Sequence, residues 1–283
     1  MIDCPIIDSH IHLVDIRRPE GVLWPKKESP LYRDWTLENY NSAVHKIRIK
    51  GAILVETGGR DADNEWLLRQ SELALILGVV GNLDPLNNEF ELKLKAFAKH
   101  PKALGLRIRP VKQYDLCSAE LAGTLAKLEG TELTVELGTP SVELIKDYES
   151  LIRKLPRQRF ILDHGGHPDL SPEFPQERWL NAMKLLAKAD NLYVKMTDQG
   201  GAFAKTSREI ANRYLQIMEN YFGIERLFFG SNWPPSSLHG ELESLLKLYF
   251  TWLGDRKQAP VQFFYKNVNQ AYPGLNLSTS KAP

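Results

Sequence analysis

The sequence predicts a single (β/α)8 barrel, which is a closed ring of eight parallel strands with helices on the outside. Short β-rich apolar runs alternate along the chain with longer stretches of helical spacing. Eight such runs can be counted, which is the number that closes a barrel of this kind. The length of 283 residues also suits one such domain. An open doubly wound sheet is the alternative arrangement of the same pattern.

The predicted strands share a run of β-branched or aromatic residues that ends at a turn-forming or polar residue. They are Ile6–His12, Gly51–Thr57, Gly78–Asp84, Ala103–Arg109, Leu133–Gly138, Arg159–His164, Asn191–Thr197 and Arg226–Asn232. The stretches between them repeat their apolar residues at helical spacing. The predicted helices are Asn64–Leu77, Glu89–Lys99, Ala119–Leu128, Ser141–Leu155, Gln176–Ala189 and Ser207–Phe222. Parallel strands joined in this way end at one face of the barrel, where its active site is expected.

Three segments depart from this repeat. Asp15–Trp35 carries three prolines and two tryptophans without periodicity, so we expect a long loop over the active face. Gly240–Leu253 is a further amphipathic stretch, and Val261–Tyr272 predicts a short last helix. We therefore expect one domain over residues 1–275 and a flexible tail over residues 276–283.

Charge and cysteine content exclude several classes of protein. The 36 Lys and Arg residues nearly balance the 35 Asp and Glu residues, so no overall field favours nucleic acid or an anionic membrane. Two cysteines make no disulfide framework, and nowhere do about 18 apolar residues run together to cross a membrane. We expect a cytoplasmic protein that acts on a small molecule, with a homodimer left open.

The sharpest local motif is Asp8-Ser9-His10-Ile11-His12. Side chains alternate along a strand, so His10 and His12 are expected to point together into the barrel mouth. Two imidazoles placed there can bind a metal ion or a substrate, and the alternative is a pair of polar residues that plugs the barrel. Asp8 lies on the same face by this count. Its carboxylate could fix an imidazole tautomer, or it could act as a turn or cap residue.

A second histidine cluster follows the sixth strand, in the segment Phe160-Ile-Leu-Asp-His-Gly-Gly-His-Pro168. Alternation sets Asp163 and His164 on opposite faces, and we assign the interior to His164. Asp163 is then expected to have a packing or capping role. His167 lies in the loop beyond, where it could contact substrate or be solvated.

Charged residues at other strand ends extend the predicted site. Arg107 and Arg109 share one strand face, and guanidinium groups suit a carboxylate or a developing oxyanion. Salt bridges with Glu56 or Glu136 are the structural alternative. Glu136 is also the favoured further metal ligand. Lys195 could polarise a substrate carbonyl or merely neutralise a carboxylate.

Aromatic residues are expected in the loops of the active face. Trp24 and Trp233 present flat rings of the kind that stack on sugar or lactone faces, and packing in a lid is the alternative. The sequence contains no serine nucleophile elbow, P-loop or dinucleotide-binding fingerprint.

These motifs together resemble the amidohydrolase superfamily, in particular its lactonase-like branch, which includes 2-pyrone-4,6-dicarboxylate lactonase, L-fuconolactonase and L-rhamnono-lactonase. The resemblance runs from about Ile7 to Tyr272 and rests on Ile7–His12, Asn64–Leu68, Gly78–Asp84, Leu104–Arg107, Phe160–Gly165, Val194–Lys195 and Phe229–Pro234. It implies a (β/α)8 barrel. It also implies that His10, His12 and His164 hold a divalent metal, zinc first, or polarise the substrate themselves.

One position departs from the family pattern. Most hydrolytic relatives have Gly-Ser-Asp-Trp-Pro after the last strand, with the aspartate as metal ligand and general base, and this chain has Asn232 there. An amide cannot take up a proton at neutral pH, but it can ligate a cation or orient a water. Asp198 is the candidate replacement carboxylate. Alternatively, a metal-bound hydroxide needs little help from a base, or the reaction differs from that of the lactonases.

The resemblance implies hydrolysis of a cyclic ester, either a sugar-acid lactone or a related carboxylated ring. Water would attack a carbonyl that the histidines or their metal ion polarise, while Arg107 and Arg109 orient the substrate. Decarboxylation or hydration on the same barrel is the second hypothesis, because it tolerates Asn232 better. A ligand-binding protein without activity is the third.

Overall fold

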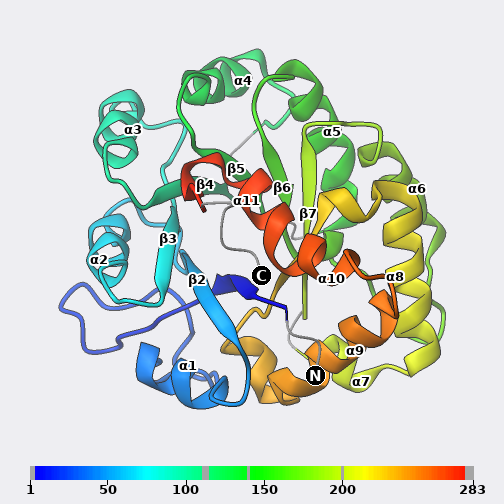
Figure 1. The fold of residues 1–283 in the computed structure, drawn as a ribbon. Coiled ribbons are helices and arrows are strands. Elements are labelled where there is room, and N and C mark those ends of the chain that lie inside the picture. The colour runs from blue at the N-terminus through cyan, green and yellow to red at the C-terminus, as the bar shows by residue number, and fades with distance from the viewer. Residues whose placement is uncertain (1–3, 110–114, 139–140, 199–200, 278–283) are drawn as a thin grey trace.

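The computed structural model describes residues 4–109, 115–138, 141–198 and 201–277, and it shows the predicted barrel. Eight parallel strands follow one another in sequence order around the ring (Figure 1). They are β1 (Ile6–Ile11), β2 (Ile49–Val55), β3 (Ile76–Gly81), β4 (Ala103–Ile108), β5 (Thr134–Leu137), β6 (Phe160–Leu162), β7 (Leu192–Thr197) and β8 (Leu227–Gly230). A parallel bridge between Ile11 and Trp233 brings β1 to the segment after β8, so the ring is nearly closed.

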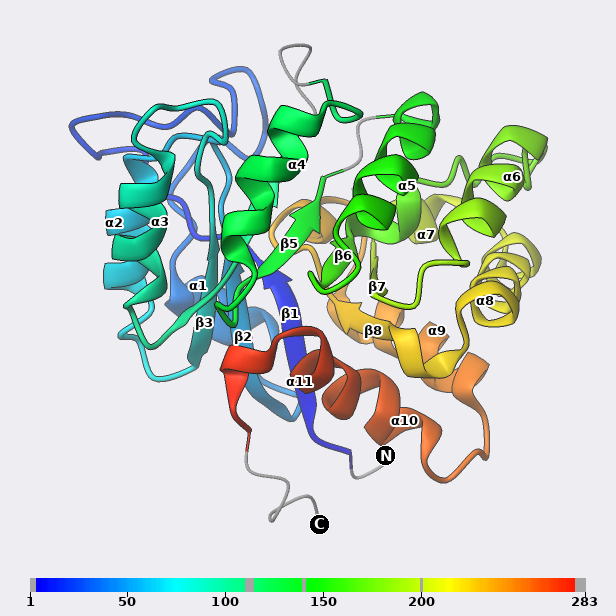
Figure 2. The same cartoon turned by 90° about the horizontal axis from the view of Figure 1, so that it is seen from above.

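Helices surround this ring on the outside (Figures 1 and 2). They are α1 (Leu37–Ala43), α2 (Asp63–Gln70), α3 (Phe90–Ala98), α4 (Ala119–Leu125), α5 (Ile145–Lys154), α6 (Glu177–Leu186), α7 (Ala202–Lys205), α8 (Arg208–Phe222), α9 (Leu242–Leu253), α10 (Ala259–Val261) and α11 (Asn267–Ala271). A π-helical segment, Gln262–Lys266, joins α10 to α11. These last helices cover the end at which the strands begin (Figure 2).

Two apolar layers hold the strands in place. Successive residues point to opposite faces, so on β6 the side chains of Phe160 and Leu162 pack in the layer toward the helices and Ile161 packs inside the ring. Each fully buried side chain of this size contributes about 1.5–3 kcal/mol. The inner layer also contains Tyr272, which follows α11. Above this layer the barrel interior is polar, and there the histidines lie.

Several element boundaries differ from the prediction. The third strand covers Ile76–Gly81 instead of Gly78–Asp84, and the helix predicted to reach Leu77 ends at Gln70. The apolar run at this point has no clear period, so helix and strand could not be separated there. Helix α1 was not predicted, because Tyr40 is its one buried residue among those described.

The long loop after β1 is confirmed over Asp15–Trp35, which forms no helix or strand. The backbone groups of Val14 and Trp35 bond reciprocally, with N to O distances of 3.0 and 2.8 Å, and so close the loop at its neck. The loop lies at the end of the barrel where the strands finish (Figure 2). Of the predicted tail, residues 278–283 lie outside the described residues.

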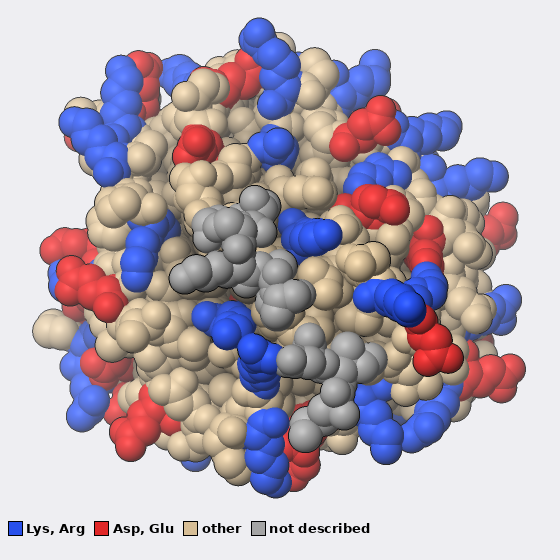
Figure 3. Space-filling view, in the orientation of Figure 1, with Lys and Arg blue, Asp and Glu red and all other residues tan. Residues whose placement is uncertain are grey.

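The surface offers no single-signed field at the face seen in Figure 3, where basic and acidic side chains are interspersed around the rim. This agrees with the balanced composition of the chain. Among the helices of the described ranges, none has the length and apolar character that a membrane crossing requires.

Strand β8 approaches β1 closely at Gly230. A Cβ added at this glycine would lie 2.9 Å from the Cβ of His10 and 3.0 Å from both Ser9 Oγ and Thr197 Cγ2. Contacts this short force the neighbouring backbone to move. The absence of a side chain at Gly230 therefore lets β8 hold His10 in its place.

We expect Gly230→Ala to lower the free energy of unfolding by roughly 1–3 kcal/mol, because the added methyl group overpacks the contact between β1 and β8. Gly123→Ala is the matched control, since an added Cβ in α4 meets nothing within 4 Å. It should be neutral or stabilising by up to about 1 kcal/mol. Urea unfolding of both variants measures the difference, and equal effects would contradict the close approach.

Candidate active site

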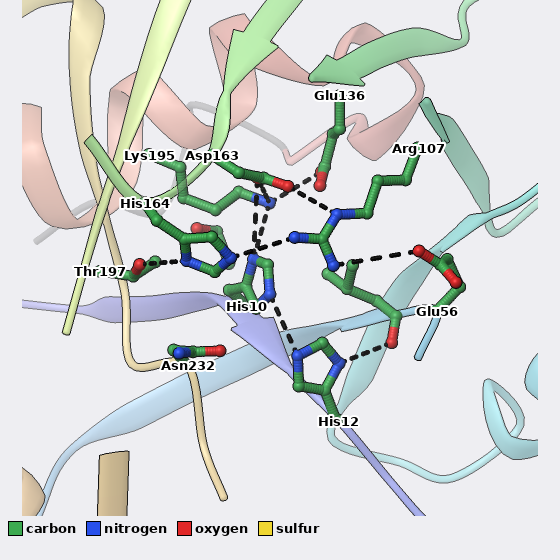
Figure 4. A network of polar contacts seen from close by, with 12 residues as sticks. His10, His12, Glu56, Arg107, Glu136, Asp163, His164, Lys195, Thr197 and Asn232 are labelled. Carbon is green, nitrogen blue, oxygen red and sulfur yellow. Dashed lines mark hydrogen bonds and ion pairs between the residues drawn. The ribbon is translucent and has the colours of Figure 1, made fainter. Parts of the chain in front are cut away.

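The three predicted histidines meet at the C-terminal end of the barrel (Figure 4). The ring centroids of His10 and His12 are 4.8 Å apart, and those of His10 and His164 are 4.9 Å apart. His10 is fully buried, whereas His12 and His164 keep 6 and 7 % of their surface exposed. A ligand at the mouth would therefore touch His12 and His164 before it reached His10.

The end of β6 departs from the predicted alternation. The strand stops at Leu162, and His164 and Gly165 adopt left-handed φ angles of 54° and 57°. Asp163 consequently faces the interior together with His164, and its Oδ2 lies 2.8 Å from Arg107 Nε. The prediction of a packing or capping role for Asp163 is wrong, because alternation holds only while the strand continues.

Asp8 does not lie on the predicted face, and its contacts match the alternative of a turn or cap residue. Its carboxylate accepts hydrogen bonds from the Tyr40 hydroxyl at 2.8 Å, from Ser231 N at 2.8 Å and from His10 N at 3.2 Å. The register of β1 against β2 shifts between Asp8 and Ile11, so the count of alternating faces fails there. Asp8 therefore ties β1 to α1 and to the segment after β8, and it does not fix an imidazole tautomer.

The hydrogen bonds of His12 determine where the ring protons lie. His12 Nδ1 is 2.9 Å from the carbonyl oxygen of Val55, which can only accept, so Nδ1 carries the hydrogen. Burial lowers the pKa of His12 to about 3, so the ring is neutral and its Nε2 bears a lone pair. His10 Nε2 lies 3.2 Å from that lone pair and donates to it. One proton therefore lies between the two Nε2 atoms.

His164 has the same tautomer as His12, but here a cation fixes it. Arg107 Nη2 donates to His164 Nε2 over 3.0 Å, and His164 Nδ1 then donates to Thr197 Oγ1 over 2.6 Å. Burial lowers the pKa of His164 well below its usual value. The guanidinium of Arg107 is thereby placed beside the imidazole at the mouth, with 7 % of the residue exposed.

Lys195 lies behind His10, with its side chain fully buried. Its Nζ is 2.7 Å from Glu136 Oε1, 3.3 Å from His10 Nδ1 and 3.5 Å from Asp163 Oδ1. Burial raises the pKa of Glu136 to about 7, although Lys195 acts to lower it. Burial would also raise the pKa of Asp163, but Arg107 and Lys195 hold it below its usual value. These contacts match the alternative in which Lys195 neutralises carboxylates.

Two other predicted substrate contacts, Arg109 and Trp24, have different surroundings. Arg109 Nε is 2.6 Å from Glu56 Oε1, so this arginine also has a carboxylate partner, and 37 % of its side chain is exposed. The ring centroid of Trp24 is 5.5 Å from that of His12. Trp24 therefore lies directly beside the histidine pair.

His167 and Trp233 differ in their access to the mouth. The His167 ring centroid is 5.0 Å from that of His164, and burial lowers the pKa of His167 to about 4. Trp233 is 2 % exposed and packs edge-on against Trp35 and Tyr40. The ring of Trp233 thus supports the long loop after β1.

Asn232 adopts a left-handed φ of 57°, a conformation that asparagine tolerates better than most residues. Its Nδ2 donates to the backbone carbonyl of Asp198 over 3.0 Å. The Asp198 carboxylate accepts from the backbone N–H of Phe203 at 3.3 Å, next to further backbone donors at the start of α7, and burial raises its pKa. The Asp198 carboxylate is therefore bound by backbone N–H groups at the start of α7.

Comparison with known proteins decides the family. The amidohydrolase family model matches residues 7–267. The chain belongs to the amidohydrolase family. It is 25% identical over 256 residues to an L-fucono-1,5-lactonase of Burkholderia ambifaria, a match that covers 87% of this chain and 85% of the relative.

Two solved structures show that other proteins share the amidohydrolase barrel. One is an amidohydrolase of Burkholderia multivorans with bound zinc, with a TM-score of 0.81 and 21% identity over 95% of this chain and 99% of that one. The other is a probable 2-pyrone-4,6-dicarboxylic acid hydrolase of Acinetobacter baumannii with citric acid bound, with a TM-score of 0.72 and 18% identity over 95% and 99%. At these identities the likeness concerns the fold alone.

The amidohydrolase's buried side chains suit a divalent ion by residue type. Ligand atoms of His10, Glu136 and Asp163 lie within 4.8 Å of one another. However, the Lys195 ammonium contacts all three of these residues. His164, another predicted ligand, gives its Nε2 lone pair to Arg107. In this arrangement Lys195 and Arg107 compete with an ion for the lone pairs of His10 Nδ1 and His164 Nε2, whereas Glu136 Oε2 has no hydrogen-bond partner among the described residues.

Sequence reasoning missed several members of the site. The Val55 carbonyl and the Thr197 hydroxyl orient two of the histidines, and Tyr272 donates its hydroxyl hydrogen to Glu136 from the opposite end of the barrel. Nothing in their local sequence indicates these contacts. The partners come together only when the ring closes.

The buried neutral histidines make stability dependent on pH. The folded pKa of His12, about 3, lies below its usual value of 6.5, so the unfolded chain binds more protons in acid. The contribution is therefore complete above about pH 6.5 and is lost as the pH falls toward 3.

We expect urea unfolding to show that His12→Gln weakens this dependence by about 1.4 kcal/mol per pH unit between about pH 5.5 and pH 4. Asn82→Ser, which alters a buried side chain that does not titrate, should keep the wild-type slope. Identical slopes for all three proteins would show that His12 is not held neutral by burial.

Proposed function

We propose that this amidohydrolase opens the ring of a sugar-acid lactone by hydrolysis. Two curated relatives, at 25 and 24% identity, are named L-fucono-1,5-lactonase. The observation that carries the proposal is the 3.2 Å hydrogen bond between the Nε2 atoms of His10 and His12. This bond places a donor, His10 Nε2–H, next to an acceptor, the lone pair of His12 Nε2.

If a substrate separated the two rings, His10 could donate to the substrate and His12 could accept from a water molecule. A lactone carbonyl oxygen can accept the hydrogen of His10 Nε2, which frees the lone pair of His12 Nε2 for a water molecule. Ester hydrolysis needs this combination, since the carbonyl must be polarised while the water loses a proton. Neither function requires the carboxylate that Asn232 lacks.

Arg107 supplies the positive charge that stabilises the oxyanion. Its guanidinium is held by Asp163 at 2.8 Å and by His164 at 3.0 Å, so it needs little reorganisation when negative charge develops. In a buried site such a fixed charge acts more strongly than it would in water.

His12 carries the proton from the water to the leaving group. The water oxygen bonds to the carbonyl carbon and its proton passes to His12 Nε2. The carbon–oxygen bond of the ring breaks, and His12 returns the proton to the leaving alkoxide. The low pKa of His12 makes it a weak base but a strong acid in the second step. The product is the open hydroxy acid.

The charge of the site favours a neutral ring over a dicarboxylate. Arg107 already faces the carboxylate of Asp163 and Arg109 that of Glu56, so a substrate carboxylate would add a permanent negative charge beside them, whereas a neutral ring develops its charge only in the transition state. Trp24, beside His12, supplies a flat apolar face of the kind that stacks on sugar rings. We therefore expect L-fucono-1,5-lactone to be a better substrate than 2-pyrone-4,6-dicarboxylate.

A lactone panel assayed by proton release tests this function. We expect Arg107→Met to lower kcat by roughly 10²–10³-fold, because it removes the charge that faces the oxyanion. Arg69→Met, which removes an exposed partner of Glu65 on α2, is the control and should be unchanged. Thermal melting verifies that both variants are folded. Absence of hydrolysis by the wild type, with release of carbon dioxide from carboxylated aromatic acids, would favour decarboxylation instead.

Asn232→Asp tests whether the site lacks a base. The aspartate cannot donate to the Asp198 carbonyl as the Asn232 amide does, so we expect a loss of roughly 1–3 kcal/mol in stability. We expect no gain in lactone hydrolysis, because the water already has the lone pair of His12. A large increase in kcat for Asn232→Asp would show that a carboxylate is the missing group.

A further inference from the structure

Lys195 takes no part in the steps above, yet it lies at the centre of the buried charges. It comes from β7, and its fully buried side chain cannot reach a ligand at the mouth. An ammonium has three N–H donors and no acceptor. Hydrogen bonds join Lys195 Nζ to His10 Nδ1 and Glu136 Oε1, and Asp163 Oδ1 is an ion-pair partner at 3.5 Å (Figure 4).

We propose that Lys195 is a positioning residue. It determines that His10 and His12 share a proton between their Nε2 atoms instead of binding a metal ion there. Because the ammonium can only donate, His10 Nδ1 must accept, and a neutral His10 then carries its hydrogen on Nε2. Val55 fixes His12 in the complementary tautomer from the other end. The two rings therefore share a proton. The positions of the protons do not depend on the proposed function. Only the role of the shared proton in catalysis rests on lactone hydrolysis.

The same two rings become a metal site when Lys195 is removed. His10 Nδ1 is 3.9 Å from Asp163 Oδ1, so without the ammonium it can donate toward this carboxylate. Both Nε2 atoms then present lone pairs 3.2 Å apart. Two nitrogen ligands of one tetrahedral zinc ion are separated by roughly 3.3 Å. Lys195 thus selects the shared proton and disfavours the ion.

The electrostatics act in the same direction. Arg107 and Lys195 are two buried cations that face Asp163 and Glu136. A divalent ion would add positive charge to this cluster, whose two carboxylates are already paired with cations. Excess positive charge in a buried site is destabilising. Replacement of Lys195 by a neutral residue removes the repulsion between the ammonium and a divalent ion. It also removes the group that keeps His10 in the Nε2–H form, in which Nε2 cannot bind a metal.

Nitrogen NMR of histidine-labelled protein tests the tautomers without reference to activity. In the wild type we expect His10 as the Nε2–H form, and His12 and His164 as the Nδ1–H forms. In Lys195→Met we expect His10 to shift to the Nδ1–H form. A wild-type His10 in the Nδ1–H form, or an unchanged His10 in the variant, would overturn the proposal.

Zinc binding gives a second and independent measurement. By equilibrium dialysis we expect Lys195→Met to bind zinc roughly 10–100-fold more tightly than the wild type, a range typical of changes beside metal ligands. Lys102→Met is the matched control, since Lys102 donates to the carbonyls of Ser71 and Ile76 instead of to the site. Equal zinc affinity of Lys195→Met and the wild type would refute the selective role.

Folding and activity are read separately. Lys195→Met leaves Glu136 without its cation, so the double variant Lys195→Met/Glu136→Gln, which removes both charges, replaces it if the single variant is unfolded. With the lactone as substrate, metal-free Lys195→Met should have a lower kcat, because His10 no longer donates from Nε2. Its KM should be unchanged, because Lys195 does not touch the substrate. If the wild type hydrolyses no lactone but shows the expected tautomers, the proposed function fails and the role of Lys195 stands.

Discussion

The buried ion pair between Arg107 and Asp163 is the contact on which the geometry of the site depends. Its two atoms are 2.8 Å apart, and Asp163 is fully buried. A charge in such a place is strongly destabilising without its partner, so each group fixes the position of the other. Through this pair Arg107 is aimed at His164, and the other oxygen of Asp163 receives Lys195.

The result is an amidohydrolase barrel whose polar layer is organised by its own cations. The histidines are neutral because burial disfavours their charged forms. Hydrogen bonds to partners that can only donate or only accept then determine each tautomer. Such a layer offers directed donors and lone pairs at the barrel mouth, where one fold can carry different site chemistries.

Strand parity predicted much of the site and failed at identifiable points. It predicted that His10, His12 and Arg107 face the interior, and their side chains meet there. They do so because the two histidines flank Ile11, where pairing with β2 resumes, and Arg107 lies on a strand that pairs with β5 without a shift. It failed for Asp8, where a register shift interrupts β1, and for Asp163, where β6 ends and left-handed residues follow. Parity counts faces, so it carries no information where the backbone ceases to alternate.

The sequence by itself determined the barrel, its strand order, the family and the meeting of three histidines at one mouth, because periodicity and local motifs are encoded along the chain. Only the tertiary structure decided what each histidine does. Val55 comes from β2, Arg107 from β4 and Lys195 from β7, and each of the three sets one ring proton. Proton positions follow from which group lies opposite each nitrogen, and that pairing exists only when distant segments close the ring.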